Sequence, residues 1–320
     1  MKIDVPDGAL KVISQLEDAG YAAFLVGGCI RDSLLGRTPK DWDICTAASP
    51  AQVLGCFPHE RTLETGMNHG TVTIILNNEM YEVSAFRAAE WGKPGNTLQI
   101  EDDLSRRDFT INAMAYHPHA GLIDPFGGQQ DLERGQIRCV GDPTFRFIED
   151  PLRVLRAIRF FSVYGFAIDP RTSKSVQAFA PMLKKVSPER IQKELMAALK
   201  GENFLSSFLL YPDVFSSILP ELTTCIGFNQ NNPWHIYDVY EHIGRAVVSY
   251  VGEDLAIKLA LLLHDIGKPA CYVEDENGIR HFPKHGEVSG VMAGKALRRL
   301  RFDRKTIETV QELVLYHDAE

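Results

Sequence analysis

Apolar and polar positions repeat with two different periods along the chain, and the change falls near residue 150. Before it, four short apolar runs have the length and β-branched content of strands: 22–26, 41–46, 72–76 and 81–86. The residues Asn77-Asn78-Glu79 separate the last two runs and predict a hairpin turn. Helical patterns lie between the strands at 8–20, 30–36 and 50–57. The first half therefore predicts a small mixed sheet with helices.

From about residue 150 onward apolar residues recur every three to four positions, which indicates helices. Pro151 fits the first position of a helix whose apolar stripe is Leu152, Leu155, Ile158 and Phe161. Further helices are expected at 172–182, 187–200, 203–210, 235–250, 254–264, 286–300 and 304–317. The pattern is still helical at the last residues, so we expect the final domain to be truncated at Glu320.

Composition narrows the class of protein. The chain is 45% hydrophobic and 24% charged, as in ordinary globular proteins. No apolar run approaches the roughly 20 residues that span a bilayer, so no membrane partner is expected. The first residues do not resemble a signal peptide, and the six cysteines show no Cys-x-x-Cys spacing. These features predict a cytoplasmic protein with reduced thiols.

Charge is distributed unevenly. The net charge is −8, yet residues 151–200 hold ten Lys or Arg and three Asp or Glu, a local charge of +7. A basic segment inside an acidic chain predicts a polyanionic partner. A solvated helix face is the alternative interpretation of the same segment.

Two aspartates separated by one residue, Asp41 and Asp43, follow a Gly27-Gly28 turn and a helix that contains Arg31. Alternate residues of a strand project from the same face, so both carboxylates are expected to face one cleft. A glycine turn lets backbone N–H groups approach a triphosphate, and paired carboxylates can hold a divalent metal against it. Glu82 on a neighbouring strand is a candidate third carboxylate, although a solvent-facing position explains it equally well.

Two further segments combine arginine with aspartate. Arg106-Arg107-Asp108 offers planar guanidinium groups that suit phosphate or ribose oxygens, and surface ion pairs explain it as well. In Glu149-Asp150-Pro151-Leu152-Arg153, Asp150 occupies the position of a helix N-cap. Alternatively, Asp150 and Arg153 present acceptor and donor edges to a nucleobase. Spacing alone leaves both interpretations open.

A series of histidines marks the last third of the chain: His242, His264-Asp265, His285 and His317. Imidazoles and a carboxylate on neighbouring helices can bind one or two divalent metals. A single histidine is more often a core residue, but the His-Asp pair with flanking histidines favours a metal site.

In order and spacing these motifs resemble those of the bacterial class II tRNA nucleotidyltransferases, the CCA-adding enzymes and the related poly(A) polymerases. The resemblance runs from about residue 10 to the end and includes Asp124-Pro125-x-Gly127-Gly128-x-x-Asp131-Leu132 and Ser187-Pro188-Glu189-Arg190-Ile191. It implies an α+β fold: a polymerase-β-like nucleotidyltransferase head at 1–140, a helical neck at 141–225 and a helical HD-like domain at 226–320.

The resemblance also implies the reaction. Members transfer CMP and AMP from CTP and ATP to the tRNA 3′ end without a template and release pyrophosphate. Asp41 and Asp43 would then be the catalytic residues that bind Mg²⁺, and Asp150 with Arg153 would choose the base. The implied nucleotide-binding residues are Gly27, Gly28, Arg31, Arg107, Asp108, Glu149, Asp150, Arg153, Arg156 and Arg159.

The histidine series resembles an HD domain that holds a second divalent metal, with His242, His264, Asp265, His285 and His317 as tentative ligands. The usual last aspartate of that domain has no clear match before Glu320, so we expect an incomplete site.

Several alternatives remain. The segment 88–105 corresponds to the family's flexible loop and looks short, which leaves an enzyme that adds only the two cytidines as an alternative to full CCA addition. An A-adding enzyme or poly(A) polymerase uses the same base-reading motif. A phosphohydrolase that works through the HD domain with a degenerate head, and a non-catalytic RNA-binding protein, are the rivals from other classes.

Overall fold

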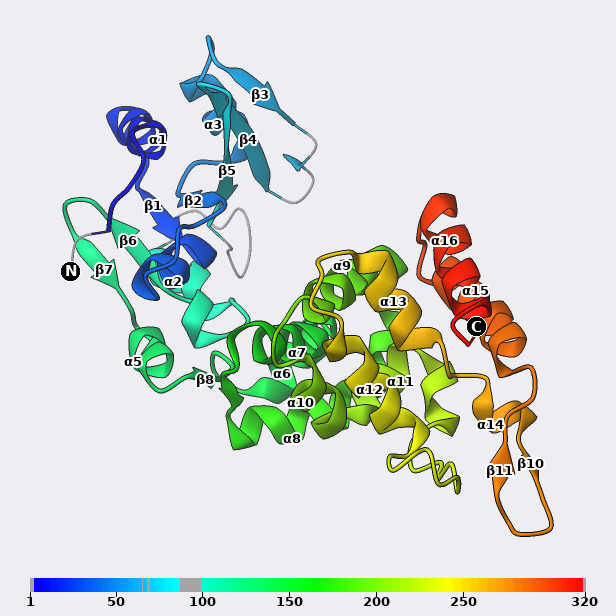
Figure 1. Cartoon of the computed structure of the whole chain (residues 1–320). Coiled ribbons are helices and arrows are strands. Elements are labelled where there is room, and N and C mark those ends of the chain that lie inside the picture. Colours follow the sequence, from blue (N-terminus) through cyan, green and yellow to red (C-terminus); the bar gives the residue numbers. More distant parts are fainter. Residues whose placement is uncertain (1–2, 65, 68–69, 87–98, 319–320) are drawn as a thin grey trace. The chain divides into compact units, whose positions relative to one another are not determined.

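The computed structural model describes residues 3–64, 66–67, 70–86 and 99–318 (Figure 1). The chain divides into two compact units, residues 1–146 and 147–320, and each is described by itself below. The predicted domain limits at 140 and 225 stay predictions. Across the described ranges, no helix is long and apolar enough to cross a membrane.

A seven-stranded sheet in the order β3-β4-β5-β2-β1-β6-β7 organises the first unit. The strands are β1 (Ala23–Val26), β2 (Trp42–Thr46), β3 (Arg61–Leu63), β4 (Thr71–Leu76), β5 (Glu79–Ala85), β6 (Ala115–His117) and β7 (Gly121–Ile123). Within the described part of this sheet, β2 and β5 are the one parallel pair, and the other neighbours are antiparallel. The sheet is mixed, as the sequence predicts.

Helices accompany this sheet. The helices α1 (Asp7–Asp18), α2 (Gly28–Leu34) and α3 (Pro50–Cys56) contact its strands. Helices α4 (Ile100–Ser105) and α5 (Gly128–Glu133) follow, and α6 (Pro143–Glu149) crosses the unit boundary, with the short strand β8 (Gln136–Ile137) between α5 and α6. Helix α1 buries one apolar face made of Ala9, Val12, Ile13 and Leu16. Helix α3 begins at a capping box in which Ser49 and Gln52 exchange hydrogen bonds.

The predicted hairpin is confirmed, because Asn77 and Asn78 join β4 to β5 with φ angles of 51° and 66°. Asparagine tolerates this left-handed conformation better than most residues, and two such residues form the turn that matches strand twist. Helix α4, the β6–β7 hairpin and α5 were not predicted. They are short elements whose buried residues lack a clear period, so the pattern of apolar positions does not reveal them.

The second unit is helical, as the sequence predicts. Its helices are α7 (Leu152–Tyr164), α8 (Pro170–Phe179), α9 (Pro188–Leu199), α10 (Phe204–Leu210), α11 (Pro212–Ile218), α12 (Val239–Ser249), α13 (Leu255–Leu263), α14 (Lys268–Cys271), α15 (His285–Arg299) and α16 (Arg304–Leu315). Short 3₁₀ helices occupy Ala180–Lys185 and Pro220–Thr224, and short strands are β9 (Ala167–Ile168), β10 (Val273–Glu274) and β11 (Arg280–His281).

Two details of this unit differ from expectation. Helix α7 is assigned from Leu152 rather than from Pro151, although Pro151 already has helical angles (φ −60°, ψ −21°) and the Asp150 carbonyl accepts a hydrogen bond from the Arg153 amide. Helix α16 ends at Leu315 and residues 316–318 form a turn, so the helix expected to run to residue 317 is shorter.

A pair of glycines tests the packing of the first unit. At Gly128 a Cβ would collide with the Thr110 carbonyl, whereas at Gly55 in α3 nothing lies within 4 Å. We expect Gly128→Ala to lower the free energy of unfolding by about 1–3 kcal/mol, because overpacked positions force the backbone to shift. Gly55→Ala should be neutral or stabilising by up to about 1 kcal/mol. Urea unfolding followed by circular dichroism measures both, and equal effects would contradict this packing.

Candidate active site and candidate metal centre

The glycine turn of the first unit lies between β1 and α2. Gly27 has a φ of 75° and its amide donates to the Met114 carbonyl at 3.2 Å. A Cβ there would lie 2.8 Å from Nη1 of Arg107, so a larger residue at position 27 would displace the guanidinium from this turn. Gly28 follows as the first residue of α2, with Nη2 of Arg31 3.6 Å from where its Cβ would be. The structure thus brings Arg107 and Arg31 to the turn.

The two aspartates lie at the start of β2. Asp41 is exposed and precedes the strand, whereas Asp43 is half-buried within it and pairs in register with Glu82 on β5. Burial and then the charge of Glu82 raise the pKa of Asp43 from 3.8 to about 6, and Asp41 adds to this while Arg107 opposes it. Three carboxylates and one guanidinium therefore act on one another here, and negative charge prevails. This donor set of carboxylate oxygens fits a hard divalent cation such as Mg²⁺.

Hydrogen bonds fix the polar residues around the turn. Arg31 is 8% exposed, and its Nη1 donates to Oδ1 of Asn112 at 2.6 Å. Nε of Arg107 donates to Oδ2 of Asp103 at 2.9 Å. Asp108 is also buried, and its Oδ1 accepts from the Asn112 side chain at 3.1 Å. Asp108 therefore positions the asparagine that holds Arg31.

In the second unit, the predicted base-reading residues form ion pairs at the start of α7. Nη1 of Arg153 lies 2.6 Å from Oε2 of Glu149. Oδ1 of Asp150 accepts from the Leu152 amide at 3.2 Å, and its Oδ2 pairs with Arg190 at 2.7 Å. One carboxylate oxygen thus serves the helix start, as the capping interpretation predicts. The other oxygen, through Arg190, links the segment 149–153 to the segment 187–191.

Two more arginines of α7 surround Glu194 on α9. The carboxylate is 4% exposed and lies 3.4 Å from Nη1 of Arg156 and 2.9 Å from Nε of Arg159. The guanidinium of Arg159 also lies 4.3 Å from the centroid of the Phe160 ring. Two cations on one buried carboxylate keep a net positive charge on this face of α7.

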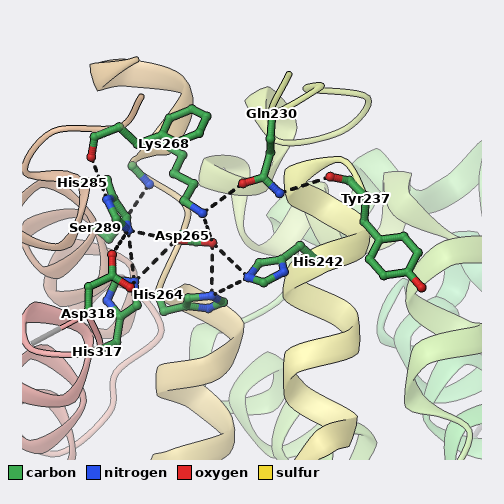
Figure 2. A network of polar contacts seen from close by, with 12 residues as sticks. Gln230, Tyr237, His242, His264, Asp265, Lys268, His285, Ser289, His317 and Asp318 are labelled. Carbon is green, nitrogen blue, oxygen red and sulfur yellow. Dashed lines mark hydrogen bonds and ion pairs between the residues drawn. The ribbon is translucent and has the colours of Figure 1, made fainter. Parts of the chain in front are cut away.

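Figure 2 shows the histidines of the second unit gathered around one aspartate. His242 comes from α12, His264 and Asp265 follow α13, His285 begins α15, and His317 follows α16. Nε2 of both His242 and His264 lies 3.2 Å from Oδ2 of Asp265. Nε2 of His285 and of His317 lies 3.3 Å and 3.5 Å from Oδ1. All five predicted residues therefore meet in one cluster, called the histidine cluster below.

Backbone contacts set the tautomers of this cluster. Nδ1 of His264, His285 and His317 lies 2.7–2.8 Å from the carbonyl oxygen three residues earlier, which only an N–H can satisfy. The neutral rings therefore turn Nε2 lone pairs inward, and those of His285 and His317 face each other at 3.1 Å. Neither buried oxygen of Asp265 has a hydrogen bond of good geometry among the described residues. Facing lone pairs beside a carboxylate fit a bound cation.

The charge of Asp265 strengthens this interpretation. Burial would raise the pKa of its carboxyl, but hydrogen bonds from the surrounding imidazoles, which donate through Nε2 when the rings are protonated and no cation is bound, hold it well below the usual 3.8. Burial would likewise lower the pKa of His317, yet contact with Asp265 raises it. Two groups of three ligands share Asp265: His242 with His264, and His285 with His317. The geometry fits two divalent ions bridged by one carboxylate.

Two residues of the cluster, Asp318 and Lys268, were not predicted from the sequence. Oδ2 of Asp318 lies 2.9 Å from Nε2 of His285, so an aspartate near the chain's end does reach the ligands, contrary to expectation. Its signal was the repeated His-Asp pair at 317–318. Lys268 is 4% exposed, and its Nζ lies 2.8 Å from Asp265 and 3.0 Å from Oε1 of the buried Gln230.

One prediction falls largely outside the described residues. The segment 88–105 was expected to be a short flexible loop, and residues 87–98 are not described. Its remaining part forms α4, so the length argument for a CC-adding enzyme stays a prediction.

Three family models match the chain in order. The poly(A) polymerase head domain matches residues 23–138, the probable RNA and SrmB-binding site of polymerase A matches 165–225, and the HD domain matches 235–319. The first covers the glycine turn and the aspartates, and the third covers the histidine cluster.

Several curated relatives are named CCA-adding enzyme. The chain is 44% identical over 200 residues to the CCA-adding enzyme of Geobacillus thermodenitrificans, which is 60% of this chain and 49% of the relative. It is 39% identical over 224 residues to that of Lactobacillus helveticus, 67% of this chain and 56% of the relative. The chain thus spans about half the length of the curated relatives it matches.

Solved structures agree with this. A Bacillus stearothermophilus CCA-adding enzyme in complex with CTP is 30% identical with a TM-score of 0.69, covering 97% of this chain and 69% of that one. A Thermotoga maritima CCA-adding enzyme with tRNA has a TM-score of 0.65 at 22% identity, covers 98% and 72% of the two chains, and shows the shared fold. The chain therefore belongs to the family of CCA-adding nucleotidyltransferases and poly(A) polymerases.

Proposed function

We propose that the chain is a template-independent tRNA nucleotidyltransferase that adds CMP and AMP to the tRNA 3′ end. The observation that carries this proposal is the placement of Asp43 beside Glu82, with Arg107 close enough to both the aspartate and the Gly27 turn to act on each. Relatives at 39–44% identity named CCA-adding enzymes support it. We place the reaction in the cytoplasm, as the cysteine spacing predicts.

In this proposal different residues of the first unit have different roles in nucleotidyl transfer. The 3′-oxygen of the RNA forms a bond to the α-phosphorus of CTP or ATP, the bond to the β-phosphate oxygen breaks, and pyrophosphate leaves. The Gly27 turn lets backbone amides approach the triphosphate, and Arg107 balances part of its charge. Asp41 and Asp43 would hold Mg²⁺, which when bound lowers the pKa of the attacking hydroxyl and neutralises phosphate charge.

In this proposal the second unit selects the base of the incoming nucleotide and binds the tRNA. We propose that Asp150 and Arg153 read the base, since together they offer hydrogen-bond acceptors and donors, and Glu149 and Arg190 hold them in place. The basic segment 151–200 would contact the tRNA backbone through phosphates, which makes binding sensitive to salt.

A gel assay tests this function. Transcripts of one tRNA that end at the discriminator base, at C and at CC are each offered CTP, ATP or both with Mg²⁺. We expect two cytidines followed by one adenosine. Arrest after two cytidines would identify a CC-adding enzyme, and adenosine added only to the CC-ended transcript an A-adding enzyme. If none of the transcripts is extended, the proposed function is wrong.

The raised pKa of Asp43 gives a prediction for Asp43→Asn. Because the folded carboxyl has a pKa of about 6, above its unfolded value of 3.8, ionisation of Asp43 costs stability progressively as pH rises from about 4 to 6 and fully above that. Asparagine cannot ionise. At pH 7.5 without metal, Asp43→Asn should therefore gain up to about 3 kcal/mol in unfolding free energy, and at pH 4 almost nothing.

Two further measurements on Asp43→Asn are the stabilisation by Mg²⁺ and the incorporation of CMP. Mg²⁺ should stabilise the wild type at pH 7.5 by relieving this cost, and should stabilise Asp43→Asn less. The variant should lose CMP incorporation while its tRNA affinity stays within about twofold, since phosphate contacts dominate that affinity. A variant that is less stable at pH 7.5, or that still incorporates CMP, contradicts the assignment.

Asp150→Ala separates base reading from helix capping. Asp169 supplies the matched control, because its Oδ1 caps α8 by accepting from the Arg171 and Thr172 amides. Each alanine variant should lose about 1 kcal/mol of unfolding free energy. Only Asp150→Ala should lower the preference for CTP over ATP on a transcript ending at the discriminator base. If both variants keep the wild-type preference in competition assays, Asp150 acts as a cap alone.

The histidine cluster supports a second activity, the hydrolysis of phosphomonoesters. The observation that favours it is the inward arrangement of four Nε2 atoms around the shared, buried Asp265. In this reaction the oxygen of water bonds to phosphorus, the ester P–O bond breaks and the alcohol leaves with a proton. Two divalent ions, when bound, would activate the water and take up charge on the phosphoryl oxygens. Lys268, anchored by Gln230, fixes one oxygen of Asp265.

Measuring one variant of each site in both assays tests whether nucleotidyl transfer and phosphomonoester hydrolysis use separate sites. His264→Ala should abolish Mn²⁺-dependent release of phosphate from adenosine 5′-monophosphate and leave CMP incorporation within about twofold. Asp41→Ala should do the reverse, because its carboxylate belongs to the first unit. If phosphate release is abolished by Asp41→Ala but retained in His264→Ala, the histidine cluster is not the site of hydrolysis.

A further inference from the structure

Asn112 lies buried beside the glycine turn of the first unit, in the 3₁₀ helix Thr110–Asn112. It is 6% exposed, so its amide needs hydrogen-bond partners within the protein. Two of these partners are charged. Nδ2 donates to Oδ1 of Asp108 at 3.1 Å, and Oδ1 accepts from Nη1 of Arg31 at 2.6 Å. A neutral side chain therefore connects a buried carboxylate to a buried guanidinium.

These two partners fix the orientation of the Asn112 amide. The carboxylate of Asp108 can only accept hydrogen bonds, and it accepts another from the Phe109 amide at 2.8 Å. The guanidinium of Arg31 can only donate. The amide nitrogen must therefore face Asp108 and the amide oxygen must face Arg31. The reverse orientation would bring two acceptors together on one side and two donors together on the other.

The amide oxygen in turn determines where the guanidinium of Arg31 lies. Asp32, the next residue of α2, holds one edge of this group, because its Oδ1 accepts from Nε at 2.9 Å. Asn112, 81 positions further along the chain, holds Nη1. A guanidinium is planar and rigid, so partners at two edges define its plane. Nη2 lies 3.6 Å from where a Cβ on Gly28 would be, which places this plane against the glycine turn.

The backbone around Asn112 forms part of the same turn. The Met114 carbonyl accepts from the Gly27 amide at 3.2 Å, and the carbonyl oxygen of Asn112 is 3.8 Å from where a Cβ on Gly27 would be. The residue that orients Arg31 is therefore fixed to the turn through its main chain as well as through its side chain.

From these contacts we infer that Asn112 is a positioning residue for the triphosphate of the incoming nucleotide, because it holds the guanidinium of Arg31 at the Gly27-Gly28 turn. The inference rests on the nucleotidyl transfer proposed above and adds a residue to its machinery. A cation that is already held in place loses less conformational freedom when it binds phosphate than a mobile one does. Removing Asn112 should therefore weaken binding of the phosphates and leave the choice of base unchanged.

Asn112→Leu tests this role, because leucine has a similar size and makes neither hydrogen bond. Thr46→Val is the matched control. It removes the buried hydrogen bond from Oγ1 of Thr46 to the Ala22 carbonyl, and Thr46 pairs with Ala23 at the end of β1 away from the glycine turn.

Titration calorimetry with Mg²⁺ gives the affinity of each variant for CTP and for inorganic tripolyphosphate. We expect Asn112→Leu to weaken both by about tenfold, as for the loss of one charge-assisted hydrogen bond. Thr46→Val should change either by less than about twofold, since additive effects are expected of distant sites. Tripolyphosphate that binds to basic residues of the second unit is common to both variants.

A double variant tests whether Asn112 acts through Arg31. Arg31→Met removes the guanidinium but keeps a long side chain, and it should weaken tripolyphosphate binding at least as much as Asn112→Leu does. In the Arg31→Met background, Asn112→Leu should change the affinity by less than about twofold, since its partner is already absent. A further loss of about tenfold in the double variant would show that Asn112 acts independently of Arg31, and would overturn the inference.

Steady-state kinetics adds a readout that a purely structural role would not give. Asn112→Leu should raise KM for CTP about tenfold and leave kcat and KM for tRNA within about twofold, because contacts made equally in the ground state and the transition state change KM alone. If leucine prevents folding, Asn112→Ser replaces it, since the serine hydroxyl is polar but too short to reach Arg31. It should weaken CTP and tripolyphosphate to the same extent as each other.

The binding data also separate this inference from the reaction on which it rests. If the wild type incorporates no CMP but Asn112→Leu binds tripolyphosphate more weakly than Thr46→Val, the transfer proposal fails and the positioning role stands. Equal tripolyphosphate affinity in these two variants overturns the positioning role, whether or not CMP is incorporated. A loss of CTP affinity without a loss of tripolyphosphate affinity also overturns it, because Asn112 would then act on the base or the sugar.

Discussion

Burying a carboxylate is costly unless a cation or hydrogen-bond donors compensate its charge. Both candidate sites of this chain are built around such a residue. Asp43 lies beside Glu82 and partly out of water, and the pKa of its carboxyl rises to about 6. Asp265 has a side chain 1% exposed, surrounded by imidazole nitrogens whose lone pairs turn inward. In each case we propose that a bound divalent cation compensates the carboxylate, and the proposed chemistry depends on that cation.

The fold meets this requirement in two different ways. In the first unit, the parallel pairing of β2 and β5 places Asp43 and Glu82 side by side, and a glycine turn lets Arg107 approach them. In the second unit, four helices present one histidine each at or near their ends, and local backbone carbonyls orient the rings. The pair of strands holds two carboxylates in a fixed register, whereas the helix ends bring together histidines from distant parts of the chain. Because the two sites lie in two compact units, we expect each to be altered without the other.

Features of the fold and the sites that depend on local sequence are predictable, whereas contacts between residues far apart in the chain are not. The Asn77-Asn78 turn, the helices of the second unit and the convergence of His264 with its partners follow from local period and motif order. The register that places Glu82 beside Asp43 does not, since strand pairing depends on the whole sheet. Asp318 was missed because a turn after α16, rather than the helix expected there, brings it to His285. The pairing of Asp150 with Arg190 likewise joins residues forty positions apart, which spacing cannot reveal.

The most direct test of the shared requirement counts the bound ions. Free Mn²⁺ can be titrated by electron paramagnetic resonance at pH 7.5 against the wild type, Asp43→Asn and Asp265→Asn. We expect the wild type to bind ions at two separate sites, Asp43→Asn to lose only those of the first unit, and Asp265→Asn to lose only those of the histidine cluster. If both variants bind as many ions with the same affinity as the wild type, neither carboxylate holds a cation and the account is contradicted.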